Sequence, residues 1–163
     1  MSSNDRDKRH WVFRVRVADR SGALTSIASA FSNRAVSIDT VVGHGGNFSP
    51  EHDGTIVVTF WCTPTEKDEM VRVVRRLTKV ISLEEHPYDS ENLRKSAVLR
   101  VTRRLTPRDV AGREAFLTCE RMEEKRGVWT YFVAGSPSEL DPIVTALKKQ
   151  GVLHDVVYSV IGL

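Results

Sequence analysis

Residues 19–40, "DRSGALTSIASAFSNRAVSIDT", decide the fold: they read as the end of a strand, a glycine turn, a helix and a second strand. Gly22 permits a sharp exit from the strand, and Leu24, Ile27 and Phe31 then recur at helical spacing. The β-branched residues of 35–43 predict the second strand. A helix that starts directly after such a turn presents unpaired backbone N–H groups, so this stretch is suited to hold a small anion.

The flanking segments complete one compact unit. Residues 10–19 alternate apolar and charged side chains and predict a strand with one buried face, and a glycine-rich loop is expected at 43–54. A strand at 55–63 leads into a helix with Thr65 as its N-cap, and a last strand is expected at 80–88. The predicted apolar stripe of this helix is Met70, Val73, Val74 and Leu77. The order β-α-β-β-α-β predicts four antiparallel strands with two helices on one face.

The second half of the chain repeats this order with one omission. Strands are expected at 96–104, 113–122, 127–135 and 152–163. The helix before the last strand, 136–151, has Ser136 as N-cap, Pro137 at its first position, Glu139 in a capping box and Gly151 as C-cap. In place of a first helix stands only "LTPRDVAG" (105–112), whose proline and glycine leave room for at most one helical turn.

We therefore predict an α+β protein of two ferredoxin-like units, the second a degenerate copy that lacks most of its first helix. The expected divisions are a disordered tail at 1–9, a first domain at 10–88, a linker at 89–95 and a second domain at 96–163.

Composition excludes several classes of protein. The net charge of +3 over 163 residues is too small to predict nucleic-acid binding unless the basic residues share one face. Cys62 and Cys119 have no neighbours at metal-ligand spacing, and we expect both to be buried free thiols in a reducing cytoplasm. The chain contains no run of eighteen apolar residues, so we expect no membrane span. Its polar start does not resemble a secretory signal.

The first unit resembles the amino-acid-binding ACT domain, and more narrowly the regulatory small subunit of acetohydroxyacid (acetolactate) synthase. The family pattern has Asn or Asp, any residue, Pro and Gly before an apolar pair, then a helix ending in Phe-Ser and a strand of the form Asn-Ile-Glu/Asp-Ser/Thr. The matching residues here are Asp19, Ser21, Gly22, Ala23, Leu24, Phe31, Ser32, Ser37, Ile38, Asp39 and Thr40. The resemblance covers 10–88 well and 96–163 more weakly.

The resemblance implies a homodimer in which two ACT domains join side by side into a continuous sheet, with an effector in each interface. The family's effector is a branched-chain amino acid, usually valine, which inhibits a separate thiamine-dependent catalytic subunit. The effector site expected here comprises Asp19, Arg20, Ser21, Gly22, Ala23 and Leu24, completed by Ser37 and Ile38 of the partner subunit. Asp19 would meet the ligand's ammonium group, and no cofactor, metal, nucleic acid or membrane is expected to take part.

Other interpretations of the same residues stay open. A turn between a strand and a helix often needs glycine and an N-capping Asp or Ser without binding anything. Asp19, Ser21 and Ser37 replace the family's usual Asn, Pro and Asn, so the affinity for valine or the choice of ligand is expected to differ from the family's. The alternative function is a stand-alone ACT-type sensor with a different effector and partner.

Other clusters of polar residues have simpler explanations. His44 and His52 share a loop with Asp53, but nothing fixes a metal-binding geometry there. The arginine-rich segments 72–79 and 100–108 are expected to be solvated faces or contacts to an acidic protein, because the aromatic pattern of an RNA-binding sheet is missing. We find no nucleophile, phosphate-loop or paired-carboxylate motif, and predict a non-catalytic regulatory protein.

Overall fold

The computed structural model describes residues 7–18, 21–46, 53–110 and 117–161. The chain divides into two compact units, unit 1 up to Ser90 and unit 2 from Glu91.

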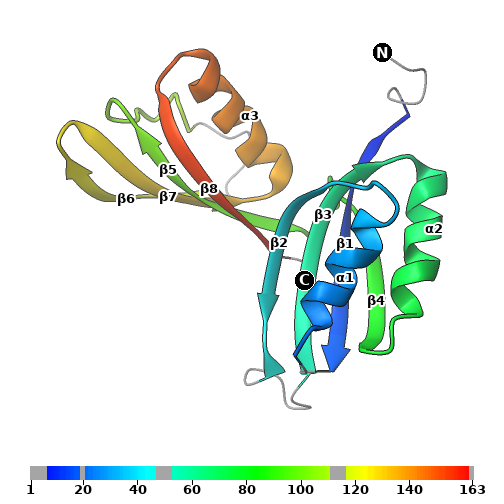
Figure 1. Cartoon of the computed structure of the whole chain (residues 1–163). Helices are drawn as coiled ribbons and strands as arrows, with labels where there is room; N and C mark the ends of the chain where they lie inside the picture. The colour runs from blue at the N-terminus through cyan, green and yellow to red at the C-terminus, as the bar shows by residue number, and fades with distance from the viewer. Residues whose placement is uncertain (1–6, 19–20, 47–52, 111–116, 162–163) are drawn as a thin grey trace. The chain divides into compact units, whose positions relative to one another are not determined.

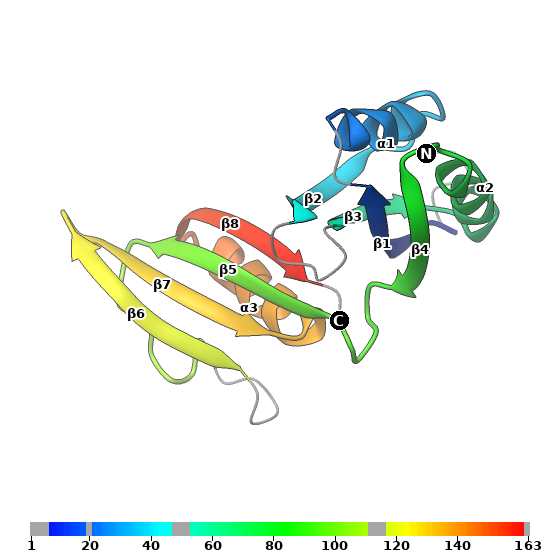
Figure 2. The same cartoon turned by 90° about the horizontal axis from the view of Figure 1, so that it is seen from below.

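Unit 1 has the predicted order β-α-β-β-α-β. Its elements are β1 (Arg9–Ala18), α1 (Ala23–Ser32), β2 (Ile38–His44), β3 (Asp53–Cys62), α2 (Pro64–Arg75) and β4 (Val80–Pro87). The sheet has the order β2-β3-β1-β4, and every neighbouring pair is antiparallel. Both helices cover the same face of this sheet (Figures 1 and 2).

The core of unit 1 lies between the sheet and the helices. β1 turns Phe13, Val15 and Val17 toward the helices, in the alternation that its sequence predicts. Phe13 and Phe31 both meet Phe60 edge to face, with ring centroids 4.7 and 4.9 Å apart. This cluster anchors α1 on the sheet and so determines where the turn before α1 lies.

α2 begins earlier than predicted. Thr63, not Thr65, is the N-cap: its Oγ1 accepts a hydrogen bond from the Glu66 N–H at 3.3 Å, and Glu66 Oε2 accepts one from the Thr63 N–H at 2.8 Å. Pro64 takes the first helical position, where its missing N–H costs nothing. Of the predicted stripe Met70 and Val74 are buried, but Val73 is only half-buried and Val71 is buried instead.

Unit 2 contains β5 (Arg94–Val101), β6 (Thr118–Lys125), β7 (Val128–Gly135), α3 (Pro137–Lys149) and β8 (Leu153–Ile161). Its antiparallel sheet has the order β6-β7-β5-β8, which repeats the topology of unit 1 (Figure 1). β5 starts inside the stretch that we expected to be a linker. The predicted strand at 113–122 is observed from Thr118 onward, and residues 113–116 lie outside the described part of the chain.

The α+β class is confirmed, and in the described part of unit 2 no helix stands between β5 and β6. Between β5 and β6, the described residues 102–110 form turns around Asp109 in place of a helix. Both carboxylate oxygens of Asp109 accept hydrogen bonds from the Arg103 guanidinium, at 2.8 and 2.9 Å, and Oδ2 also accepts from the N–H and hydroxyl of Thr106, both at 2.7 Å. These bonds hold the pKa of Asp109 well below its ordinary value, Arg103 having the largest effect.

α3 has its predicted N-cap, its C-cap lies one residue before the predicted Gly151, and one cysteine prediction is wrong. Ser136 is the N-cap with Glu139 in a capping box, and Gly151, with φ +66°, follows the C-cap residue Gln150. Cys62 is a buried free thiol as predicted, but Cys119 is exposed because it lies on the edge strand β6, all eight residues of which are exposed. Within the described residues, no helix is long and apolar enough to cross a membrane.

Candidate effector site

The turn between β1 and α1 has the conformation expected of an anion-binding helix start. Gly22 is the N-cap of α1 with φ +81° and ψ 8°, a left-handed conformation that favours glycine. No described side chain caps this end of α1, and the first turn contains no acidic residue. The Ser26 N–H and hydroxyl both donate to the Gly22 carbonyl, at 3.0 and 2.9 Å, so the turn is tied to the helix. The first N–H groups of α1 therefore carry the positive end of the helix dipole.

A shallow cavity of about 330 Å³ lies beside this turn. It is lined by Val17, Ala18, Gly22, Ala23, Leu24, Val41, Gly43, His44, Gly45, Gly54 and Ile56. The side chains of Leu24 and Val41 are 48% and 45% exposed, so an apolar surface next to the helix start faces solvent. The helix start can bind a carboxylate, and the apolar surface beside it can bury an aliphatic side chain. A free apolar amino acid carries both groups.

The predicted site residues do not all meet within one chain. Ser37 and Ile38 line a separate cavity of about 270 Å³, together with Asp39, Trp61 and Cys62 among others. It lies beyond the C-terminal end of α1, and ten helical residues span about 15 Å. Within one chain, the Gly22 turn and the pair Ser37 and Ile38, which together make up the predicted effector site, are therefore separated.

The remaining predicted residues are partly accounted for. Ser21 is exposed in the turn and Ala23 is buried beneath it. Asp19 and Arg20 lie outside the described residues, and the contact of Asp19 with an ammonium group stays a prediction.

Sequence reasoning missed Lys79. This residue follows α2, yet its ammonium Nζ donates a hydrogen bond of 2.6 Å to the Ser21 carbonyl. A Cβ placed on Gly22 would lie 3.0 Å from the same Nζ. No local sequence pattern could predict this contact, because its two residues are 58 positions apart.

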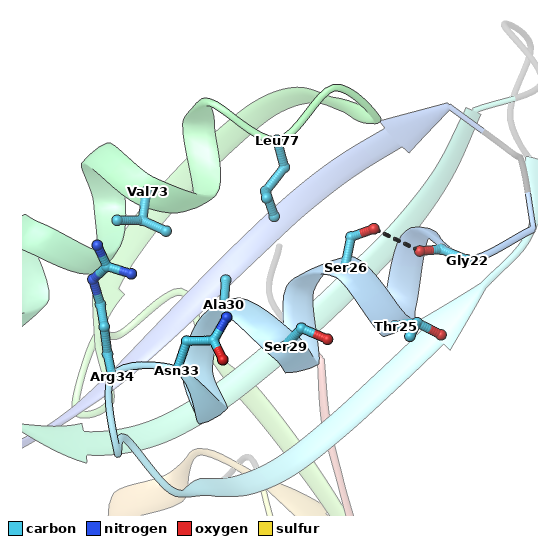
Figure 3. Close-up of a pocket in the computed structure, with 9 residues that line it drawn as sticks. All are labelled: Gly22, Thr25, Ser26, Ser29, Ala30, Asn33, Arg34, Val73 and Leu77. Atoms are coloured by element: carbon cyan, nitrogen blue, oxygen red, sulfur yellow. Dashed lines mark hydrogen bonds between the residues drawn. The ribbon is translucent and has the colours of Figure 1, made fainter.

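A second hollow adjoins the turn on its outer side. The groove between α1 and α2 has a volume of about 510 Å³ and runs from Gly22 at one end to Asn33 and Arg34 at the other (Figure 3). Thr25, Ser26 and Ser29 give it a hydroxyl-bearing wall, and Val73 and Leu77 form the opposite wall.

A reactive thiol and a metal site are the two catalytic features that the described residues of this sequence could offer. Burial raises the pKa of the Cys62 thiol to about 12, so the thiolate needed for nucleophilic attack is scarce at neutral pH. No group of three His, Cys, Asp or Glu side chains lies where it could hold a metal ion in the parts of the chain that the structure describes. His44 lines the cavity beside the turn, while His52 lies outside the described residues.

Comparison with solved structures identifies the architecture. The small subunit of acetolactate synthase from Thermotoga maritima superposes with a TM-score of 0.70 at 15% identity, covering 95% of this chain and 96% of that one. The chain has a two-unit ACT-type fold. The regulatory subunit of aspartate kinase from Thermus thermophilus has a TM-score of 0.47 at 13% identity, covering 86% of this chain and 91% of that one.

Sequence comparisons add no closer relationship. A scan against models of protein families finds no match, and neither does a search of curated proteins. An ACT-type fold shared at 15% identity leaves the function to be argued from the site.

Proposed function

We propose that this protein is a non-catalytic regulatory subunit, acting in the cytoplasm, that binds a branched-chain amino acid such as valine and thereby modulates a separate thiamine-dependent acetolactate synthase subunit. The observation that carries the proposal is the left-handed Gly22 turn, uncapped by any described side chain, beside the exposed Leu24 and Val41 surface. The similarity of both units to an acetolactate synthase small subunit supports it.

The site is completed by a second copy of the chain. The cavity beside the turn is open, and β2 lies at the edge of its sheet, where it can pair with another strand. In a side-by-side homodimer, Ser37 and Ile38 of the partner subunit would cover the ligand. Two copies together would bury more of the ligand's aliphatic side chain than either copy can bury alone.

Thermal unfolding of the purified protein against each common amino acid tests this function. A ligand at one hundred times its dissociation constant stabilises the folded state by about 2.7 kcal/mol, a shift of several degrees. Valine, leucine or isoleucine is expected to produce it, and Gly22→Asp to remove it.

The control is Gly127→Asp, which places the same side chain at φ +77° in the β6–β7 turn of unit 2, at a residue that is not part of the proposed site. It should lower stability through backbone strain and keep the amino-acid response. Wild-type protein that responds to no amino acid would refute the proposal, and a normal response in Gly22→Asp would remove this turn from the site.

A stand-alone sensor is the second candidate, favoured by the Asp109 turn that replaces a helix in unit 2. The two candidates differ in their partner. A catalytic subunit of acetolactate synthase from the same organism should associate at micromolar concentration and gain valine sensitivity under the first. Amino-acid binding without such association would favour the sensor.

A further inference from the structure

Lys79 contacts the β1–α1 turn through both its backbone and its side chain. Its backbone carbonyl accepts a hydrogen bond of 2.9 Å from the N–H of Ala18, the last residue of β1. Its ammonium donates to the carbonyl of Ser21, directly before Gly22. One residue of the α2–β4 connection thus binds both the end of β1 and the residue before Gly22.

The two contacts have different origins. The backbone bond to Ala18 continues the pairing of β1 with β4 and needs no particular side chain. The bond to Ser21 exists only because residue 79 has a long side chain that ends in a charged donor. Substitution at position 79 can therefore release the helix side of the turn while the strand side stays bound.

We propose that Lys79 is a positioning residue for the effector turn, holding Ser21 and Gly22 in their binding conformation before a ligand arrives. This inference rests on the proposed function and adds a residue to its site. If the turn adopts the binding conformation only part of the time, the observed affinity for the ligand falls in proportion to that fraction. The Lys79 ammonium also adds positive charge at the end of α1 that already attracts a carboxylate.

Three substitutions separate this role from general stability. Lys79→Met keeps the length of the side chain and removes the donor, whereas Lys79→Arg keeps a charged donor. Arg76→Met is the matched control, since it removes one positive charge three positions away and the Arg76 side chain has no partner among the described residues.

The first measurement is the dissociation constant for valine by calorimetry on the full-length protein. Lys79→Met should weaken binding about tenfold, the typical loss for one charge-assisted hydrogen bond, with little change in the denaturation midpoint. Lys79→Arg should restore most of the affinity, and Arg76→Met should bind like wild type. Equal affinity in Lys79→Met and wild type would overturn the inference.

The second measurement needs no ligand. The Ser26 amide, which donates to the Gly22 carbonyl, should exchange with solvent several-fold faster in Lys79→Met than in Arg76→Met. If wild type binds no amino acid, the proposed function fails by itself, and this exchange rate still decides whether Lys79 orders the turn. An unchanged rate would show that it does not.

Discussion

Replacing Asp109 with asparagine should destabilise unit 2 in a manner that depends on pH. The side chain of Asp109 is only 8% exposed and accepts four hydrogen bonds, two of them from the Arg103 guanidinium. Asparagine keeps the shape but has one acceptor oxygen, and its NH₂ group would face the donors of Arg103 or Thr106. Bonds to a charged group are worth more than neutral ones, so we expect Asp109→Asn to lose about 1–2 kcal/mol of unfolding free energy at pH 7.

The pH dependence follows from the lowered pKa of Asp109. Because folding lowers this pKa, the carboxylate contributes its full stabilisation above the unfolded-state value of about 3.9 and loses it as the pH falls toward the folded-state value. The difference between wild type and Asp109→Asn should therefore be largest at neutral pH and shrink below about pH 4.

Urea denaturation at a series of pH values, followed by circular dichroism, measures this difference. Asp155→Asn is the control, because Asp155 is 48% exposed, forms a surface pair with Arg100 at 3.5 Å and accepts one hydrogen bond from the Val156 N–H at 2.8 Å, which an amide oxygen can also accept. That variant should lose less than about 0.5 kcal/mol. A destabilisation by Asp109→Asn that persists unchanged at pH 2 would contradict the account, since the carboxylate of the unfolded wild-type chain is largely protonated by then and the native carboxylate has lost part of its stabilising effect.

Two further predictions concern backbone strain and thiol reactivity. Ala35 has φ +53°, where a Cβ costs about 1–2 kcal/mol, so Ala35→Gly should raise the unfolding free energy by about 0.5–1 kcal/mol after the entropy cost of glycine; a lower urea midpoint would contradict this. In the native protein a thiol reagent should modify exposed Cys119 much faster than buried Cys62, whose reaction should wait for unfolding. Rapid labelling of Cys62 in a Cys119→Ser variant would show that the core opens readily.

Elements with short-range signals were predicted well from the residues. The capping box of α3 depends on Ser136 and Glu139, three positions apart, and Glu139 Oε2 accepts hydrogen bonds from the N–H and the hydroxyl of Ser136, at 2.8 and 2.7 Å. The alternation in β1 identified its buried face, since side chains of a strand point to opposite sides in turn. The start of α2 was misplaced by two residues because Thr63 and Thr65 both flank Pro64 and either can cap a helix in isolation.

Features that depend on neighbours distant in sequence were missed. Cys119 was expected in a core because its segment contains apolar residues, yet β6 is an edge strand, and position in a sheet is not encoded by a strand's own residues. The left-handed backbone at Ala35 follows from the tight connection between α1 and β2, which delays the strand from the predicted 35 to Ile38.

The sequence by itself determined the order of the elements, the two-unit α+β class and the glycine turn before α1, because these depend on side chains within one or two helical turns of each other. Only the tertiary structure placed Lys79 against Ser21 and separated that turn from Ser37 and Ile38. The pairing of β4 with β1 brings Lys79 and Ser21, 58 positions apart, into contact. The packing of α1 along the sheet holds the turn and the pair Ser37 and Ile38 apart by the length of a helix.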